Sequence, residues 1–64
     1  MNEKITLSNG DVETIPVEEN SEYKFYLCGT NPVAADVAQT LTLLGNNAVV
    51  DFNSRYGWFV RVKK

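Results

Sequence analysis

The first part of the chain alternates apolar and polar residues on both sides of the dipeptide Asn9-Gly10. Asn-Gly between alternating segments is a strong signal for a two-residue hairpin turn, because both turn positions need a positive φ. We therefore predict a hairpin within residues 4–15 that places Leu7 opposite Val12. In that register Ile15 points to the other face, unless a bulge near Pro16 resets the alternation. Pro16 is expected to end the second strand or to place it at an edge.

A second alternating segment, residues 23–28, is rich in aromatic residues and predicts a strand that Gly29 ends. Because side chains alternate across a strand, one face carries Tyr23, Phe25 and Leu27 and the other Lys24, Tyr26 and Cys28.

The period then changes to that of a helix. Asn31 suits the N-cap position and Pro32 the first helical position, where a missing N–H costs nothing. Gly45 stands where a left-handed C-terminal residue belongs. The apolar stripe of this helix is Val33, Ala34, Val37, Ala38, Leu41 and Leu44. Leu43 falls on the opposite face with polar residues, so we predict a large apolar side chain exposed to solvent.

Residues 48–52 and 58–62 predict two further strands joined by a loop that contains Gly57. Trp58, Val60 and Val62 share one face of the last strand, and Phe59, Arg61 and Lys63 share the other. The predicted fold is therefore α+β, a small twisted antiparallel sheet with one helix packed on one face, in the order β-β-β-α-β-β.

The length of 64 residues leaves room for one domain, residues 1–64, with a small core. Domains of this size often depend on a disulfide, a metal or a partner for stability. Cys28 is the only cysteine and histidine is absent, so neither an intrachain disulfide nor a zinc-type ligand set is expected. A binding partner or self-association is the remaining source of additional stability.

Charge is distributed unevenly along a chain whose net charge is only −2. Acidic residues dominate up to Glu22, and every charged residue from Arg55 onward is basic. We expect the two ends to complement one another across the sheet, with a dedicated acidic or basic binding face as the alternative.

The N-terminal residues lack the apolar stretch of a signal peptide, and no segment approaches the length of a membrane span. A single unpaired cysteine also fits a reducing compartment. We therefore expect a cytoplasmic protein without a membrane partner.

No group of residues in the sequence predicts catalysis or a cofactor. Cys28 has no histidine to act as a base, and we interpret it as a buried structural thiol. The loop from Gly29 to Pro32 lacks the glycines or the Lys-Ser/Thr pair of a phosphate-binding loop, so it is interpreted as helix capping. Asp51 is predicted to point into solvent. We expect no enzyme, no cofactor and no metal site.

The sequence therefore favours a small non-enzymatic protein-binding module that acts by surface docking or as a homodimer. Tyrosine, tryptophan and arginine are the residue types that carry most interface energy. The residues predicted to contact a protein partner are Leu43, Tyr26, Tyr56 and Phe59. Short cofactor-free domains are frequent among accessory or regulatory proteins of phages and mobile elements, so an accessory role of that kind is expected.

The alternative is a domain that binds single-stranded nucleic acid through its C-terminal strand. Aromatic rings interleaved with basic residues can stack bases while cations contact phosphates. The rings would come from Trp58 or Phe59, and the cations from Arg55, Arg61, Lys63 and Lys64.

Overall fold

The computed structural model describes all 64 residues and contains five strands and one helix. The elements are β1 (Asn2–Thr6), β2 (Val12–Glu19), β3 (Tyr23–Gly29), α1 (Asn31–Leu43), β4 (Ala48–Asn53) and β5 (Gly57–Lys63). All strand pairs are antiparallel and form one open sheet in the order β1-β2-β3-β5-β4. The predicted α+β fold and its order of elements are confirmed.

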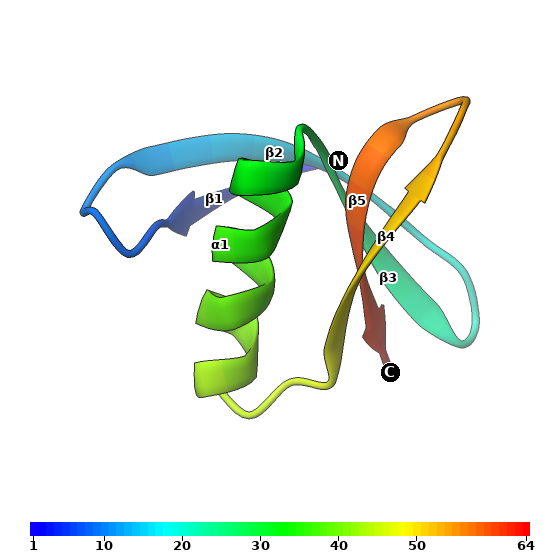
Figure 1. Ribbon diagram of the computed structural model, residues 1–64. Helices are drawn as coiled ribbons and strands as arrows, with labels where there is room; N and C mark the ends of the chain where they lie inside the picture. Colours follow the sequence, from blue (N-terminus) through cyan, green and yellow to red (C-terminus); the bar gives the residue numbers. More distant parts are fainter.

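The single helix covers one face of the sheet (Figure 1). It packs against β3, β4 and β5, while the β1–β2 hairpin extends past its other side. The core lies between these two layers and is entirely apolar apart from the hydroxyl of Tyr26. Its buried members are Ile5, Leu7, Ile15, Val17, Tyr26, Ala34, Val37, Ala38, Leu41, Val60 and Val62.

The first hairpin turns through three residues, Ser8 to Gly10, rather than the predicted two. The Leu7 N–H donates to the Asp11 carbonyl (2.7 Å) and the Gly10 N–H to the Leu7 carbonyl (3.0 Å). Only Gly10 has a positive φ, as in a turn that ends with a glycine bulge. The extra residue pairs Ile5 with Glu13 and leaves Val12 exposed. Our predicted pairing of Leu7 with Val12 is therefore wrong.

The corrected register removes the conflict that the predicted turn created. Ile5 and Leu7 now share a face with Ile15 and Val17, and all four side chains are buried without a bulge. Pro16 does not end β2. The strand pairs with β1 as far as Pro16 and with β3 from Val17 onward, so the residue without an N–H lies where β2 changes neighbours.

Helix α1 begins and ends close to the predicted positions. Its N-cap is Thr30 in extended conformation, and Asn31 is the first helical residue rather than the cap. At the other end the Gly45 N–H donates to the Thr42 carbonyl and the Asn46 N–H to the Leu41 carbonyl. With Gly45 at a φ of 93°, these bonds form a Schellman motif. Leu44 follows the last helical turn and is exposed, so the predicted apolar stripe ends at Leu41.

Candidate functional site: the uncovered face of the sheet

One face of the central strands has no helix packed on it, and we call it the outer face. It carries Tyr23, Phe25 and Leu27 from β3, because their alternate neighbours Tyr26 and Cys28 point toward α1. Phe59 on β5 lies opposite Leu27, and Arg61 lies opposite Phe25, so both belong to the same face. An antiparallel sheet commonly keeps one face solvated, but a solvated face normally carries polar residues.

The rings of the outer face contact one another. The ring centroids of Phe25 and Phe59 lie 6.0 Å apart in an edge-to-face arrangement, and those of Tyr23 and Phe25 lie 6.1 Å apart. Both spacings fall within the range of favourable aromatic pairs. The cluster is held in a defined geometry by its strands, although no helix packs on this face.

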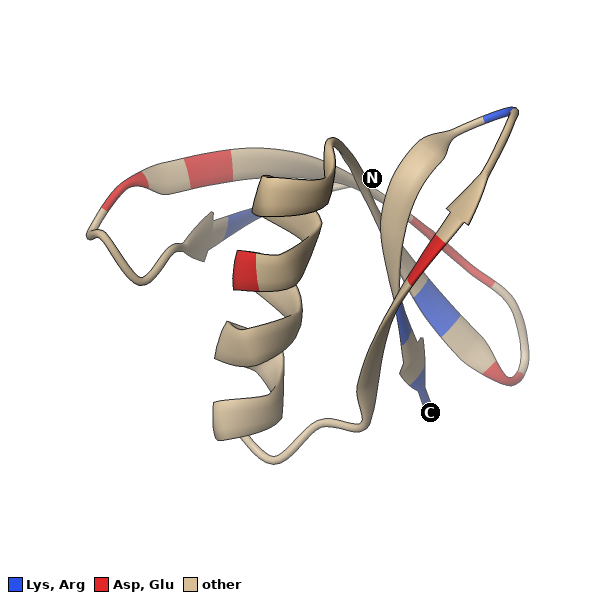
Figure 2. Cartoon of the chain, viewed as in Figure 1, with Lys and Arg blue, Asp and Glu red and all other residues tan.

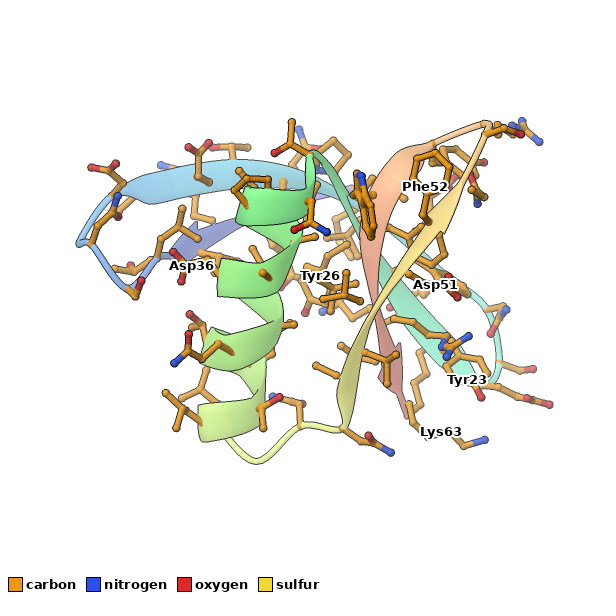
Figure 3. All side chains as sticks on the ribbon, viewed as in Figure 1. Tyr23, Tyr26, Asp36, Asp51, Phe52 and Lys63 are labelled. Atoms are coloured by element: carbon orange, nitrogen blue, oxygen red, sulfur yellow. The ribbon has the colours of Figure 1, made fainter.

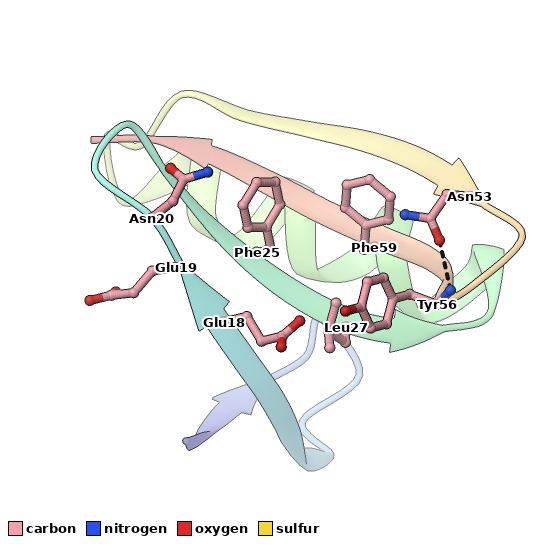
Figure 4. Close-up of a pocket in the computed structure, with 8 residues that line it drawn as sticks. All are labelled: Glu18, Glu19, Asn20, Phe25, Leu27, Asn53, Tyr56 and Phe59. Carbon is pink, nitrogen blue, oxygen red and sulfur yellow. Dashed lines mark hydrogen bonds between the residues drawn. The ribbon is translucent and has the colours of Figure 1, made fainter.

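A shallow pocket of about 370 Å³ lies on this cluster (Figure 4). Its apolar wall consists of Phe25, Leu27, Tyr56 and Phe59, and its polar rim of Glu18, Glu19, Asn20 and Asn53. Figure 4 shows α1 behind the sheet, on the side away from the pocket. Tyr56 is positioned by the β4–β5 turn, where its N–H donates to the Asn53 side chain (2.6 Å). The pocket therefore combines residues of β2, β3, β4 and β5 with residues of the β2–β3 and β4–β5 turns.

The acidic rim comes from the end of β2. Glu18 lies opposite Phe25 across the β2–β3 pair, and its exposed carboxylate has no ion-pair or hydrogen-bond partner. The neighbouring Glu19 is paired with Lys64 at 3.4 Å. This pair joins the acidic first part of the chain to its basic end, as the charge distribution predicted. Glu18 is thus the unpaired charge beside the aromatic wall.

Figure 2 shows basic and acidic residues interspersed along the strands. Most of the predicted phosphate-binding cations have a partner within the chain. Arg61 pairs with Asp51 at 3.4 Å, and Lys64 pairs with Glu19. Arg61 and Lys63 also lie over the ring of Tyr23, at 5.6 and 5.0 Å from its centroid. Arg55 lies over the ring of Tyr56, 5.2 Å from its centroid.

The two aromatic residues of the predicted nucleic-acid site lie on opposite faces of β5. Trp58 is on the helix side, packed against the core and against Phe52 at a centroid distance of 5.2 Å. Phe59 is on the outer face and is only 8% exposed. The six residues of that predicted site therefore do not form one surface.

The residues predicted to contact a protein partner also lie in different places. Tyr26 is 4% exposed and lies between the sheet and α1, so it is a core residue and is removed from the interface (Figure 3). Leu43 is 81% exposed at the end of α1, as predicted from the helical period. Tyr56 and Phe59 meet in the outer-face pocket.

The sequence patterns did not indicate the other six residues of this pocket, which include Glu18, Phe25 and Leu27. Alternation grouped Phe25 with Leu27 correctly, but it did not indicate which face of β3 the helix covers. The register supplies that information: Tyr26 is opposite both Val17 and Val60, and these two residues are fully or nearly fully buried. This chain has one helix, which can cover only one face of the sheet. A strand with apolar residues on both faces therefore indicates that one apolar face is left without a helix.

Cys28 is partly buried and packs against the core, which agrees with its interpretation as a structural thiol. Burial raises the pKa of its thiol to about 11, so the thiolate is scarce at neutral pH. No group of three or more cysteine or acidic side chains is arranged to hold a metal ion. Helix α1 is neither long nor apolar enough to span a membrane.

Comparison with known proteins finds no family model, no curated protein sequence and no solved structure that matches this chain.

Proposed function

We propose that this chain is a small non-enzymatic protein-binding module that docks a partner on its outer face. The observation that carries the proposal is the half-buried cluster of Tyr23, Phe25 and Leu27 on a sheet face that no helix covers. The ring of Phe59, 8% exposed, lies at the base of this cluster. Aromatic residues held rigidly on strands lose little side-chain entropy when a partner covers them. They are also among the residue types that dominate binding energy.

The outer face is a better docking surface than the exposed end of α1. Leu43 and Leu44 are more exposed than any ring of the outer face, but Leu43 lines no pocket. The depression beside Leu44 has Ile5 and Leu41 as its other apolar residues and contains no aromatic ring. The outer face offers a pocket with polar groups at its rim, which resembles the apolar centre and polar margin of protein interfaces.

Charge favours a segment with basic and apolar residues as the occupant. The rim of the pocket holds Glu19 and the unpartnered Glu18, whereas Arg61 and Lys64 are ion-paired. Arg55 and Lys63 lie over the rings of Tyr56 and Tyr23. A phosphate backbone would meet the Glu18 carboxylate beside the aromatic wall, and that contact is repulsive. These observations support a protein partner over single-stranded nucleic acid.

We also propose that the module acts in the cytoplasm as an accessory or regulatory protein encoded by a phage or mobile element. The unpaired thiol of Cys28 supports a reducing compartment. The scarcity of thiolate at neutral pH supports a non-enzymatic role.

The test is selection of binding peptides from a displayed library of random 12-residue sequences against the folded protein. We expect the selected peptides to be enriched in lysine or arginine next to aliphatic residues. A Phe25→Ser variant should weaken their binding by at least about tenfold, because an aromatic centre is lost. Leu43→Asp is the matched control and should leave binding unchanged. Circular dichroism establishes that both variants are folded.

Other outcomes would redirect the proposal. Loss of peptide binding with Leu43→Asp alone places the interface on α1. Binding of labelled oligonucleotides with a clear dependence of affinity on salt supports the nucleic-acid alternative. If sedimentation shows a dimer that Phe25→Ser dissociates, the occupant of the outer face is a second copy of this chain.

A further inference from the structure

We propose that the outer-face pocket binds the alkylammonium group of a lysine side chain supplied by the partner. The inference rests on the proposed function for the source of the lysine, but the pocket itself can be tested without any partner. It assigns a ligand chemistry to Glu18, Phe25, Tyr56 and Phe59.

The wall of the pocket is chemically suited to a cation on an apolar stem. Phe25 and Phe59 meet edge to face, and Tyr56 lies at the far end of the same depression (Figure 4). Aromatic rings attract a nearby cation through the negative potential of their faces, and methylene groups pack well against the same rings. Leu27 extends the apolar floor on which a four-carbon stem can lie.

Glu18 supplies the charge that distinguishes an ammonium group from a neutral ligand. Its carboxylate lines the pocket and has no partner within the chain. In the view of Figure 4 the Glu18 side chain extends toward Leu27. Neutral apolar ligands would leave this carboxylate without a counter-charge, and anions would be repelled by it.

The cations of the chain do not already fill this role. Lys64 is held at the outer rim by Glu19, and Arg61 by Asp51. Arg55 lies over the Tyr56 ring, but it comes from the turn itself and forms no ion pair with Glu18. Arg55 also shows that a ring of this pocket accepts a cation. Lys63 lies over Tyr23, so no cation of the chain is paired with Glu18 or lies over Phe25 or Phe59. We therefore assign the cation of the ligand to this part of the pocket.

The experiment is an NMR titration of the ¹⁵N-labelled protein with Nα-acetyl-lysine N-methylamide, in which the side-chain ammonium group is free. The control ligand is N-acetyl-norleucine methylamide, which has the same alkyl stem without the ammonium group. We expect the lysine derivative to shift the amides of Glu18, Phe25 and Phe59 with millimolar affinity, about fivefold more tightly than the norleucine derivative. Equal affinity for the two ligands, or no saturable shift of these amides, overturns the inference.

Two variants test whether the Glu18 carboxylate is the group that favours the ammonium ligand. Glu18→Gln should reduce affinity for the lysine derivative about fivefold and leave norleucine binding unchanged. Glu13→Gln alters an exposed carboxylate outside the pocket and should change neither. A Glu18→Gln effect no larger than that of Glu13→Gln overturns the role of Glu18. If peptides bind the outer face while the lysine derivative does not, this inference fails and the proposed function stands. If the lysine derivative binds while no peptide does, the ligand of the pocket is established and the proposed function fails.

Discussion

Ser8 and Asp36 connect the first hairpin to the helix, although 28 positions separate them in sequence. The Ser8 N–H donates to Asp36 Oδ1 (3.1 Å) and the Ser8 hydroxyl to Asp36 Oδ2 (3.0 Å). Asp36 is the only charged residue of α1, and Figure 3 shows it on the side of the helix that faces the hairpin turn. One carboxylate therefore holds the end of the hairpin against the helix.

This contact predicts a measurable coupling between the two side chains. In a double-mutant cycle of Ser8→Ala and Asp36→Ala, urea unfolding should give a coupling free energy of about 0.5–1 kcal/mol. The cycle cancels the gain in helix propensity that alanine brings to α1. Glu13 lies in the same hairpin without a hydrogen-bond or ion-pair partner, so a cycle of Ser8→Ala with Glu13→Ala should give no coupling. Equal coupling in the two cycles would contradict the contact.

Gly57 should tolerate substitution less well than Gly10, although both glycines have a positive φ. A Cβ at Gly57 would lie 3.1 Å from the Gly29 carbonyl oxygen, whereas one at Gly10 would meet nothing within 4 Å. Gly10→Ala should cost about 1 kcal/mol, the usual penalty for a left-handed L-residue, and Gly57→Ala about 2 kcal/mol. Chemical denaturation of the two variants measures both. A larger loss for Gly10→Ala would mean that the β3–β5 approach is looser than described.

Most of the fold could be predicted because local signals and long-range packing agree. The strand alternation around residues 23–28, Pro32 near the start of the helix and Gly45 after its end all specify elements that the structure contains. The first turn was the main error, since Asn-Gly also fits a three-residue turn in which glycine alone has a positive φ. The decisive constraint was tertiary: only the longer turn buries Ile5 together with Ile15.

The candidate site was harder to predict because it depends on which apolar face the helix covers. Tyr26 and Phe25 are adjacent aromatic residues, and sequence alone does not say which of them is buried. The structure places Tyr26 in the core because its neighbours across both strand pairs, Val17 and Val60, are core residues. Glu18 could not be assigned either, since its position beside Phe25 follows from the β2–β3 register.

Cys28 should react slowly with alkylating reagents at neutral pH. Burial raises the pKa of its thiol from 9.0 to about 11, so at pH 8 the thiolate fraction is about 100-fold lower than in the unfolded chain. The greater nucleophilicity of a more basic thiolate offsets part of this, which leaves an expected rate at least ~10-fold lower. Iodoacetamide labelling in buffer and in urea, from pH 7 to 11, gives both profiles. A native profile with its midpoint below pH 9 contradicts the burial of the thiol.

The ion pair between Lys24 and Glu3 should stabilise the fold only while Lys24 is protonated. The hydrogen bond to Glu3 is the main cause that raises the pKa of Lys24 above its ordinary 10.5, and Tyr26 adds to it against the opposing effect of burial. A base with a raised folded-state pKa contributes stability that is complete below the unfolded value and lost as the pH rises through the folded one. The contribution therefore persists up to about pH 10.5 and declines above it.

The measurement compares urea unfolding of the parent and Glu3→Gln proteins between pH 8 and 12, both carrying Cys28→Ala so that the thiol does not titrate in the same range. The parent should be more stable by about 0.5–1 kcal/mol at pH 8, as expected for a partly exposed pair. This difference should shrink above pH 10.5 as Lys24 loses its proton. Glu19→Gln, which removes the more exposed pair with Lys64, serves as the control and should have a smaller effect. A Glu3→Gln difference that does not change up to pH 12 would show that Glu3 stabilises the fold without the charge of Lys24.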